Sequence, residues 1–411
     1  MQEIPITRSL VRRFILLCGL VVLAAVIIWQ VAHLMANPAI MPPDDFVEYW
    51  AAGRLNAAGE NPYDPAKLLP LQQHAGRDTD EAIMMWNPPW TLAFVMPFGL
   101  LPARPSQLLW LALSLSSVVY CADWGWRYYG GSAKHRWAAW SLALTFMPTL
   151  FVLQSGQIGP ALLLGVVGFL HFARRDRGWL AGAATVLIAI KPHLAYLFWV
   201  ALLLWSLDRR RWTVLLGGGV AGLTAMLIAL ACNPAVISHY REAMGHHPPE
   251  QWISPTPGAF LRVLVGGEMF YLQFVPTLAG LAWFVPHWIR HRNTWKWAEQ
   301  MPLLLLVSFV TASYGAWPFD LVVLLLPIVQ LAVLVQTADR RSLFALALGA
   351  YLLINGLALT LNLLRFTSKW FVWMAPALLV SYLILRTLGS RTIAVSLPES
   401  APRSFGGVAH A

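Results

Sequence analysis

Long apolar runs fill most of this chain, and they exclude most folds that are stable in water. Many of these runs approach or exceed the roughly 17–25 residues that a helix needs to cross a bilayer. A soluble domain normally has about 25% charged residues, whereas this chain of 411 residues has 12%, together with 58% hydrophobic residues. We therefore predict an all-α polytopic membrane protein.

The basic residues come in small groups between the apolar runs, although the net charge is +10. A nucleic-acid-binding protein would gather its basic residues into one patch or arm, so we expect no nucleic-acid partner. Loops rich in Lys and Arg usually lie on the cytoplasmic side of a membrane. If all the basic groups lie there, the chain crosses an inner or plasma membrane twelve times, with both termini cytoplasmic. The predicted helices are 14–35, 106–124, 137–153, 158–173, 178–190, 193–207, 212–232, 270–289, 300–313, 319–336, 343–362 and 371–387.

The first predicted helix resembles a signal peptide, and one later pair of helices is unusually short. The run 14–35 follows three arginines as in a signal peptide, but it is longer than a signal peptide's apolar core and lacks a clear A-x-A cleavage site. We interpret it as a retained signal anchor. Helices 178–190 and 193–207 are short and joined by a Lys-Pro pair, so they form either two crossings or a re-entrant hairpin. Residues 1–391 are then one transmembrane domain, and 392–411 are a polar, disordered tail.

Two long segments between predicted helices lie on the external side. The first, 36–107, contains DDFVEYWAAGRL, in which Phe46, Tyr49 and Trp50 share one helical face. This pattern is typical of an amphipathic helix at the membrane interface. The same segment contains WTLAFVMPFGLL, which is too short to span a bilayer and predicts a second juxtamembrane helix. The other long segment is 233–269.

Common catalytic and metal-binding motifs are missing from the sequence. The three cysteines lie in or beside apolar runs and form no disulfide framework or metal motif. The pair His246-His247 would need further ligands to bind a metal ion. The chain has no Walker loop, Rossmann glycine pattern, HExxH or GxSxG. We therefore predict no metal site, and these absences argue against an ATP-driven pump.

Two adjacent carboxylates, Asp44 and Asp45, start the first external helix. A carboxylate there can reach an aqueous acceptor and a lipid-linked substrate, and it could take a proton from an attacking hydroxyl. The alternative is a structural role, because acids at a helix N-terminus cap it and complement its dipole. The spacing alone supports both interpretations equally.

Lys191 lies between two apolar runs, in LIAIKPHLAYLF. A cation at membrane depth is costly and usually faces a cavity or a partner. Pro192 breaks the helix there, and His193 adds a titratable donor. Together they could hold an anionic phosphate. The alternative is a hairpin tip from which the lysine reaches water.

Further polar residues lie near the predicted external ends of helices. Asp320, in SYGAWPFDLVVLLLP, could line a cavity with Tyr314 and Trp317, or it could be a helix-terminal acid in an aromatic belt. The polar stretch QSGQ at 154–157 is either a tight turn or a ligand site. Arg54 and Arg77 could bind phosphate or simply be solvated.

The order and spacing of several short motifs resemble family 87 glycosyltransferases. The resemblance extends from the first predicted helix to the tenth. In chain order the motifs are Asp45-Phe46, Tyr49-Trp50-Ala51-Ala52-Gly53-Arg54, Gly59, Asn61-Pro62-Tyr63-Asp64, Trp86-Asn87-Pro88-Pro89, Gly156-Gln157, Lys191-Pro192 and Pro318-Phe319-Asp320-Leu321.

The resemblance implies a GT-C fold and an inverting transfer on the external, periplasmic face. It implies a donor in which a polyprenyl phosphate carries the sugar, with mannose favoured, and a lipid or glycan acceptor. The acid before Phe in the first loop corresponds to Asp45, the presumed base, with Asp44 as the nearest substitute. Lys191 corresponds to a contact of the donor phosphate. The other substrate-binding candidates are His193, Arg54, Tyr63, Asn87, Gln157, Tyr314 and Asp320.

Two other function classes remain open at this point. Twelve crossings and a buried cation also suit a transporter or lipid flippase, although no inverted repeat is evident. A non-catalytic scaffold would leave Asp45 and Lys191 dispensable. No cofactor is expected, because a departing lipid phosphate already carries charge, but a divalent metal is compatible with the sequence.

Overall fold

The computed structural model describes residues 41–246 and 253–396, which are helical throughout and contain no strand within these ranges. The predicted signal anchor, 14–35, lies outside the described residues, as does 397–411 of the predicted tail. The last helix continues to Ser396, so the start of that tail is helical rather than disordered.

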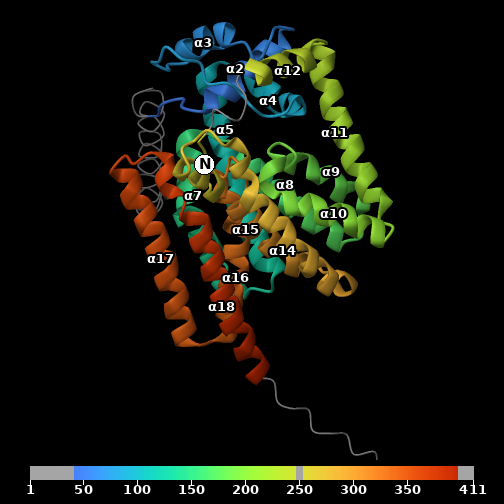
Figure 1. Ribbon diagram of the computed structural model, residues 1–411, viewed down its shortest axis with the longest axis vertical. Helices are drawn as coiled ribbons and strands as arrows, with labels where there is room; N and C mark the ends of the chain where they lie inside the picture. The colour runs from blue at the N-terminus through green and yellow to red at the C-terminus, as the bar shows by residue number, and fades with distance from the viewer. Residues whose placement is uncertain (1–40, 247–252, 397–411) are drawn as a thin grey trace, which may run out of the picture.

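The helices form two layers, a cap of short helices above a bundle of longer ones (Figure 1). The cap contains α2 (Phe46–Ala57), α3 (Pro65–His74), α4 (Leu92–Gly99) and α12 (Val236–His246). The bundle contains α5 (Ala103–Tyr128), α6 (Trp137–Thr145), α7 (Met147–Ser155), α8 (Gly159–Arg174), α9 (Gly178–Ile188), α10 (Tyr196–Asp208), α11 (Trp212–Cys232), α14 (Val275–His291), α15 (Trp297–Thr311), α16 (Leu325–Ala338), α17 (Arg341–Leu363) and α18 (Met374–Ser396).

Short 3₁₀ turns and one small helix complete the architecture. Most of these turns lead directly into the helix that follows, often where a proline or a bulky aromatic residue starts it. They are η1 (Pro89–Thr91), η2 (Ala133–His135), η3 (Pro192–Ala195), η5 (Phe270–Phe274), η6 (Arg292–Thr294), η7 (Asp320–Leu324) and η8 (Ser368–Phe371), and the small helix is α13 (Pro257–Leu264).

The apolar helices show that this is a membrane protein, but they do not confirm the predicted count of twelve crossings. Among the described residues, five helical segments are long and apolar enough to span a bilayer, or six if the pair α6 and α7, bent by 50°, is one span. Four further apolar helices are shorter, namely α8, α9, η3 with α10, and α15. The other eleven predicted segments, from 106–124 onward, all fall on helices.

Helix α2 corrects one prediction about the first external segment. We expected one apolar face on the membrane interface, but ten of the twelve residues of α2 are buried. Helices α3, α4, α5 and α11 cover it on several sides. Its polar residues are therefore held inside the protein; Asn56, for example, donates to the carbonyl of Ala229 on α11 at 3.2 Å.

The cap packs tightly because two glycines let backbones approach each other. A Cβ at Gly53 of α2 would lie 2.6 Å from the carbonyl oxygen of Val95 on α4. Gly99 makes the reciprocal approach to the backbone of Arg54. The second predicted juxtamembrane helix, α4, is thus a short helix that packs on α2.

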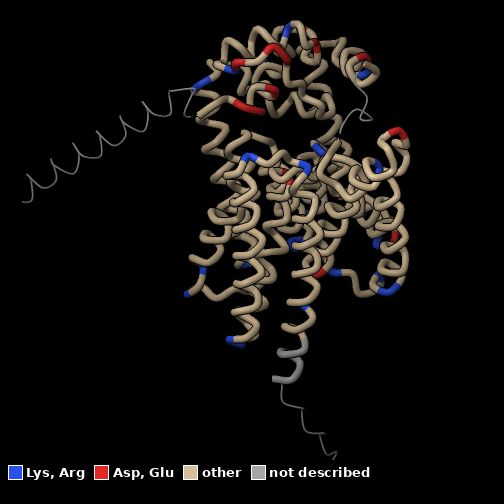
Figure 2. The backbone as a smooth tube through the Cα atoms, turned by 60° about the vertical axis from the view of Figure 1, so that its left-hand side comes forward, with Lys and Arg blue, Asp and Glu red and all other residues tan. Residues whose placement is uncertain are grey.

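The loops at the end of the bundle away from the cap are rich in Lys and Arg, whereas the cap holds many of the acids (Figure 2). These basic turns contact one another. Arg209 donates to the carbonyls of Arg292 and Asn293 at 3.1 and 2.7 Å, and Arg211 pairs with Asp176. The hairpin of α9 and α10 therefore reaches from this basic end to the Lys191 turn at the other end.

Candidate functional site

Three turns from distant parts of the chain meet under the N-terminus of α2. They are the turn between α7 and α8, which carries Gln157, the turn after α9, which carries Lys191, and the start of η7, which carries Asp320. Asp45 immediately precedes α2 and faces them. The structure thus brings together four residues that the sequence singled out.

Gln157 links the acidic side of this cluster to its cationic side. Its Nε2 donates to Asp45 Oδ2 at 2.9 Å and to Glu48 Oε1 at 3.3 Å. Its Oε1 accepts from the Tyr49 hydroxyl at 2.6 Å and from Lys191 Nζ at 3.0 Å. Both amide hydrogens and both lone pairs are used. The reversed amide would place its oxygen against two carboxylates, so these partners determine the orientation.

Gly156 explains why Gln157 can reach the start of α2. Its φ is +72°, a left-handed conformation that L side chains rarely adopt. A Cβ at this position would lie 2.7 Å from the Cβ of Phe46. Glycine is therefore required both for the turn and for the close approach.

Lys191 is paired inside the protein. Its Nζ lies 2.8 Å from Asp320 Oδ1, and the two side chains are 12% and 1% exposed. Asp320 Oδ2 accepts from the backbone N–H of Trp317 at 3.1 Å, and the ammonium lies 5.1 Å from the ring centre of Phe319. This arrangement contradicts the alternative in which Lys191 only reaches water.

Asp45 does not act as a simple helix cap. It occupies the N-cap position of α2, but its side chain makes no capping hydrogen bond and turns to Gln157 instead. Its Oδ1 has no hydrogen-bond partner among the described residues. Burial raises the pKa of Asp45, and the hydrogen bond from Gln157 and the charge of Lys191 oppose that rise. A half-buried carboxylate with one unused oxygen can accept a proton.

Asp44 is the less well placed of the two acids. Its backbone has a φ of +40°, so the chain turns sharply just before α2. Its pKa is raised to about 6, by partial burial and by the charge of Asp45. Asp44 therefore adds negative charge to the entrance of the site.

Glu48 is a functional candidate that sequence reasoning missed. It is 6% exposed, and it lies one helical turn after Asp45, so both carboxylates point at Gln157. Burial and the charge of Asp45 raise the pKa of Glu48 to about 8. The i, i+3 spacing from Asp45 was the available signal, because it places both carboxylates on one side of a helix.

Asn87, His193 and Tyr314 support the Lys191 turn. Asn87 Nδ2 donates to the carbonyl of Ile190 at 3.1 Å, so this candidate positions the turn. The rings of His193 and Tyr314 lie 4.6 Å apart and are tilted by 33°. A Cβ at Gly315 would meet the His193 ring, so this loop packs tightly.

Tyr63 and Arg54 are held away from the cluster. Tyr63 packs against Tyr240 inside the cap, with ring centres 5.3 Å apart. Arg54 donates to the carbonyl of Gly99 at 3.3 Å and lies over Trp50. The arginine whose charge lowers the pKa of both Asp44 and Asp45 is Arg77.

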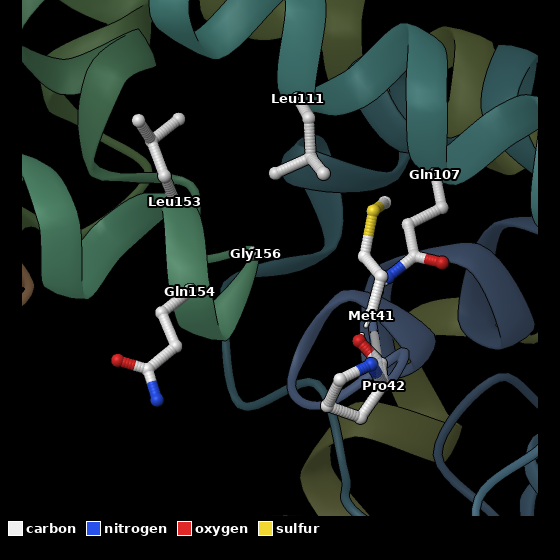
Figure 3. A pocket seen from close by; sticks show the side chains of 7 residues that line it. All are labelled: Met41, Pro42, Gln107, Leu111, Leu153, Gln154 and Gly156. Atoms are coloured by element: carbon white, nitrogen blue, oxygen red, sulfur yellow. Dashed lines mark hydrogen bonds between the residues drawn. The ribbon is translucent and has the colours of Figure 1, made fainter. Parts of the chain in front are cut away.

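A small cavity of about 120 Å³ lies next to the turn that carries Gln157 (Figure 3). The amide of Gln107 in its wall donates to the carbonyl of Pro42 at 2.9 Å. Its lining residues are Met41, Pro42, Gln107, Leu111, Leu153, Gln154 and Gly156. Within the described ranges, no group of three or more His, Cys, Asp or Glu is arranged to hold a metal ion.

The model of glycosyltransferase family 87 matches residues 86–313, more than half of the chain. This chain belongs to glycosyltransferase family 87. The search of curated proteins found no match. The search of solved structures found none either.

Family membership makes this protein a glycosyltransferase and does not favour a transporter or flippase. The matched segment carries Asn87, Gln157 and Lys191. Asp45 and Asp320 lie outside it, on either side in the sequence, and the fold brings them to the residues within it. The candidate site therefore combines the matched segment with its two flanks.

Proposed function

We propose that this glycosyltransferase moves a hexose, with mannose favoured, from a polyprenyl-phosphate donor to an acceptor hydroxyl on a lipid or glycan. The observation that carries the proposal is the shared contact of Asp45 and Lys191 with one side chain, Gln157. A proton acceptor and a phosphate-binding cation are then close enough to act on one substrate.

The transfer needs one base and one group that stabilises the leaving phosphate. Asp45 takes the proton of the acceptor hydroxyl, whose oxygen attacks the anomeric carbon. The bond from that carbon to the phosphate oxygen breaks, and the polyprenyl phosphate leaves with the electron pair. Attack on the face opposite the phosphate inverts the configuration at the anomeric carbon.

Lys191 has the capacity to stabilise the leaving phosphate. An ammonium has three N–H donors. Among the described residues, two donors of Lys191 contact Asp320 and Gln157. The third donor is left for a phosphate oxygen. We propose no cofactor, so transfer should persist in the presence of EDTA.

The small cavity near the Gln157 turn suits entry of the acceptor. Its wall includes Pro42, three residues before Asp45, and Gly156, the neighbour of Gln157. The cavity is lined by Met41 and Pro42, which lead into α2 of the cap. The basic turns lie at the far end of the bundle (Figure 2). By the positive-inside rule the cap then faces the exterior, which supports transfer on the external side.

The direct test incubates the purified protein with a panel of polyprenyl-phospho-sugars and scores the release of polyprenyl phosphate. We expect release with one sugar, strongest when an acceptor is present, and no detectable release by the Asp45→Asn variant. The matched control is Asp44→Asn, which should remain active. Release from no donor in the panel, or equal release by the Asp45→Asn variant, would contradict the proposal.

A further inference from the structure

A second, larger cavity of about 510 Å³ lies between α9, α10 and α11. These three helices form one side of the bundle, below the cap (Figure 1). We call this cavity the α9–α11 groove. Its lining residues are Trp90, Thr185, Val186, Ala189, Trp199, Leu202, Leu203, Val214, Leu215, Gly218, Gly219, Gly222, Leu223 and Met226.

Glycines build this groove in two ways. Gly182 of α9 and Gly217 of α11 bring the two helices into backbone contact, against Val214 and Trp179 respectively. Farther along α11, a Cβ at Gly219 or Gly222 would meet nothing within 4 Å. The first pair holds the helices together, and the second pair leaves the space between them open.

The wall of the groove is apolar, because each polar side chain that lines it is already engaged. Thr185 Oγ1 donates to the carbonyl of Gly182 at 2.7 Å. The indole N–H groups of Trp90 and Trp199 donate to backbone carbonyls at 3.1 and 3.2 Å. With no free donor, the groove suits a hydrocarbon chain and does not suit a sugar.

One end of the groove is attached to the Lys191 turn. Trp90 donates to the carbonyl of Ala189, and Trp199 donates to the carbonyl of Pro192. The two tryptophans therefore hold the backbone on both sides of Lys191. At the rim, Leu203 and Leu223 are 49% and 60% exposed, which opens the groove toward lipid.

We propose that the α9–α11 groove binds the isoprenoid chain of a lipid monophosphate whose phosphate contacts Lys191. This proposal rests on the proposed function and assigns a place to the tail of the donor. Charge complementarity selects this occupant. The groove is apolar along its wall, and one end of it is joined to the turn that carries Lys191, as a single-chain lipid with a terminal phosphate requires. A glycerophospholipid would have to leave its second acyl chain outside the groove.

Filling the groove gives a test that separates the tail from the phosphate. Gly222→Leu places a side chain in open space on α11, and Gly356→Leu is the matched control on α17, where a Cβ also meets nothing within 4 Å. The probes are undecaprenyl phosphate and methyl phosphate, which has no isoprenoid chain, with dioleoyl phosphatidate as the phospholipid. Binding to the purified, detergent-solubilised proteins is measured directly, without catalysis.

We expect Gly222→Leu to weaken binding of undecaprenyl phosphate about tenfold, the cost of losing about two buried methylene groups. Methyl phosphate should bind with less than about a threefold change, since it has no chain to enter the groove, and Gly356→Leu should change neither affinity. Lys191→Met should weaken the binding of both undecaprenyl phosphate and methyl phosphate.

Three outcomes would overturn the groove assignment. Equal weakening of undecaprenyl phosphate and methyl phosphate binding by Gly222→Leu would indicate a general structural effect. No change with either probe would place the tail elsewhere. Phosphatidate that binds as tightly as undecaprenyl phosphate and is equally sensitive to Gly222→Leu would make this an ordinary lipid site. If the wild-type protein binds no isoprenoid phosphate at all, the proposed donor fails as well.

Discussion

The two ends of the bundle each hold a buried carboxylate cluster, but the clusters differ in how completely they are paired. At the end away from the cap, Asp123 is 6% exposed and accepts hydrogen bonds from Arg127, Arg136 and Trp140. Its carboxylate has two guanidinium partners and an indole partner. This cluster is closed, with no capacity left for a ligand.

The cluster under the cap is acidic and incompletely paired. Three acids lie here, Asp45, Glu48 and Asp320, and among the described residues only Asp320 has a direct cationic partner, Lys191. Burial of unpaired charge is costly, so a protein keeps such an arrangement where it serves a purpose. We propose from this contrast that Asp123 stabilises the fold, whereas Asp45 and Lys191 act in the transfer.

The largest effect expected from this contrast is at Asp45. Asp45→Asn keeps the shape of the side chain and removes the base, so the rate should fall about 10²–10⁴-fold. Asp44→Asn should change the rate by less than about threefold, because Asp44 is not hydrogen-bonded to Gln157. The rates are compared at equal amounts of folded protein, checked by thermal unfolding. Similar losses in the two variants would remove the distinction between the two acids.

The second effect concerns Lys191 and separates catalysis from stability. Lys191→Met should slow transfer about 10²–10³-fold and destabilise the protein by about 3–5 kcal/mol, because Asp320 stays buried without its partner. Adding Asp320→Asn should restore much of the melting temperature and none of the rate. A double variant that recovers transfer would make Lys191 structural, like the arginines around Asp123.

A smaller, pH-dependent effect is expected at Glu48. With its pKa raised to about 8, Glu48 is neutral at pH 7 and ionises as the pH rises through about 8. The new negative charge would repel the donor phosphate, so wild-type transfer should decline above that pH. Glu48→Gln resembles the neutral form, and it should keep the rate at pH 7 and lose the alkaline decline.

The same group links pH to stability. Its folded-state pKa lies above the ordinary value of 4.5, so its stabilising contribution is complete below pH 4.5 and is lost as the pH rises to about 8. Glu48→Gln should remove this slope from the melting temperature. An inactive but folded Glu48→Gln variant at pH 7 would show that the ionised carboxylate is needed.

The smallest effect on activity is expected at Asp123. Asp123→Asn weakens pairs whose arginines are about half exposed, so solvent screening limits the loss of stability to about 1 kcal/mol. The rate per folded molecule should be unchanged, measured alongside the melting temperature. A large loss of rate in a folded variant would mean that the closed cluster also takes part in transfer.

Much of the helical layout could be predicted from the sequence, because hydropathy acts locally. Helix α11 begins and ends at the predicted residues. The number of crossings could not be predicted in the same way, since α8 and α9 are too short to meet the length of a span by themselves.

Members of the candidate site could be predicted where the cost of burying a charged side chain singles out a residue. A lysine at membrane depth needs a partner, and Lys191 has one in Asp320. Glu48 was missed, and Arg54 was expected at the site but lies away from it, on Gly99 and Trp50. Both differences have one cause, because packing decides which face of α2 is buried. Helices distant in the sequence cover α2, so the pattern of its twelve residues cannot reveal which polar groups point inward.

The most direct test of the account is a structure with a bound donor analogue, in which a phosphonate replaces the cleavable phosphate. We predict the phosphonate within hydrogen-bond distance of Lys191 Nζ, with the anomeric carbon between it and Asp45. A phosphonate bound beside Arg127 and Arg136 at the other end of the bundle, or anywhere out of reach of Lys191, would contradict the account.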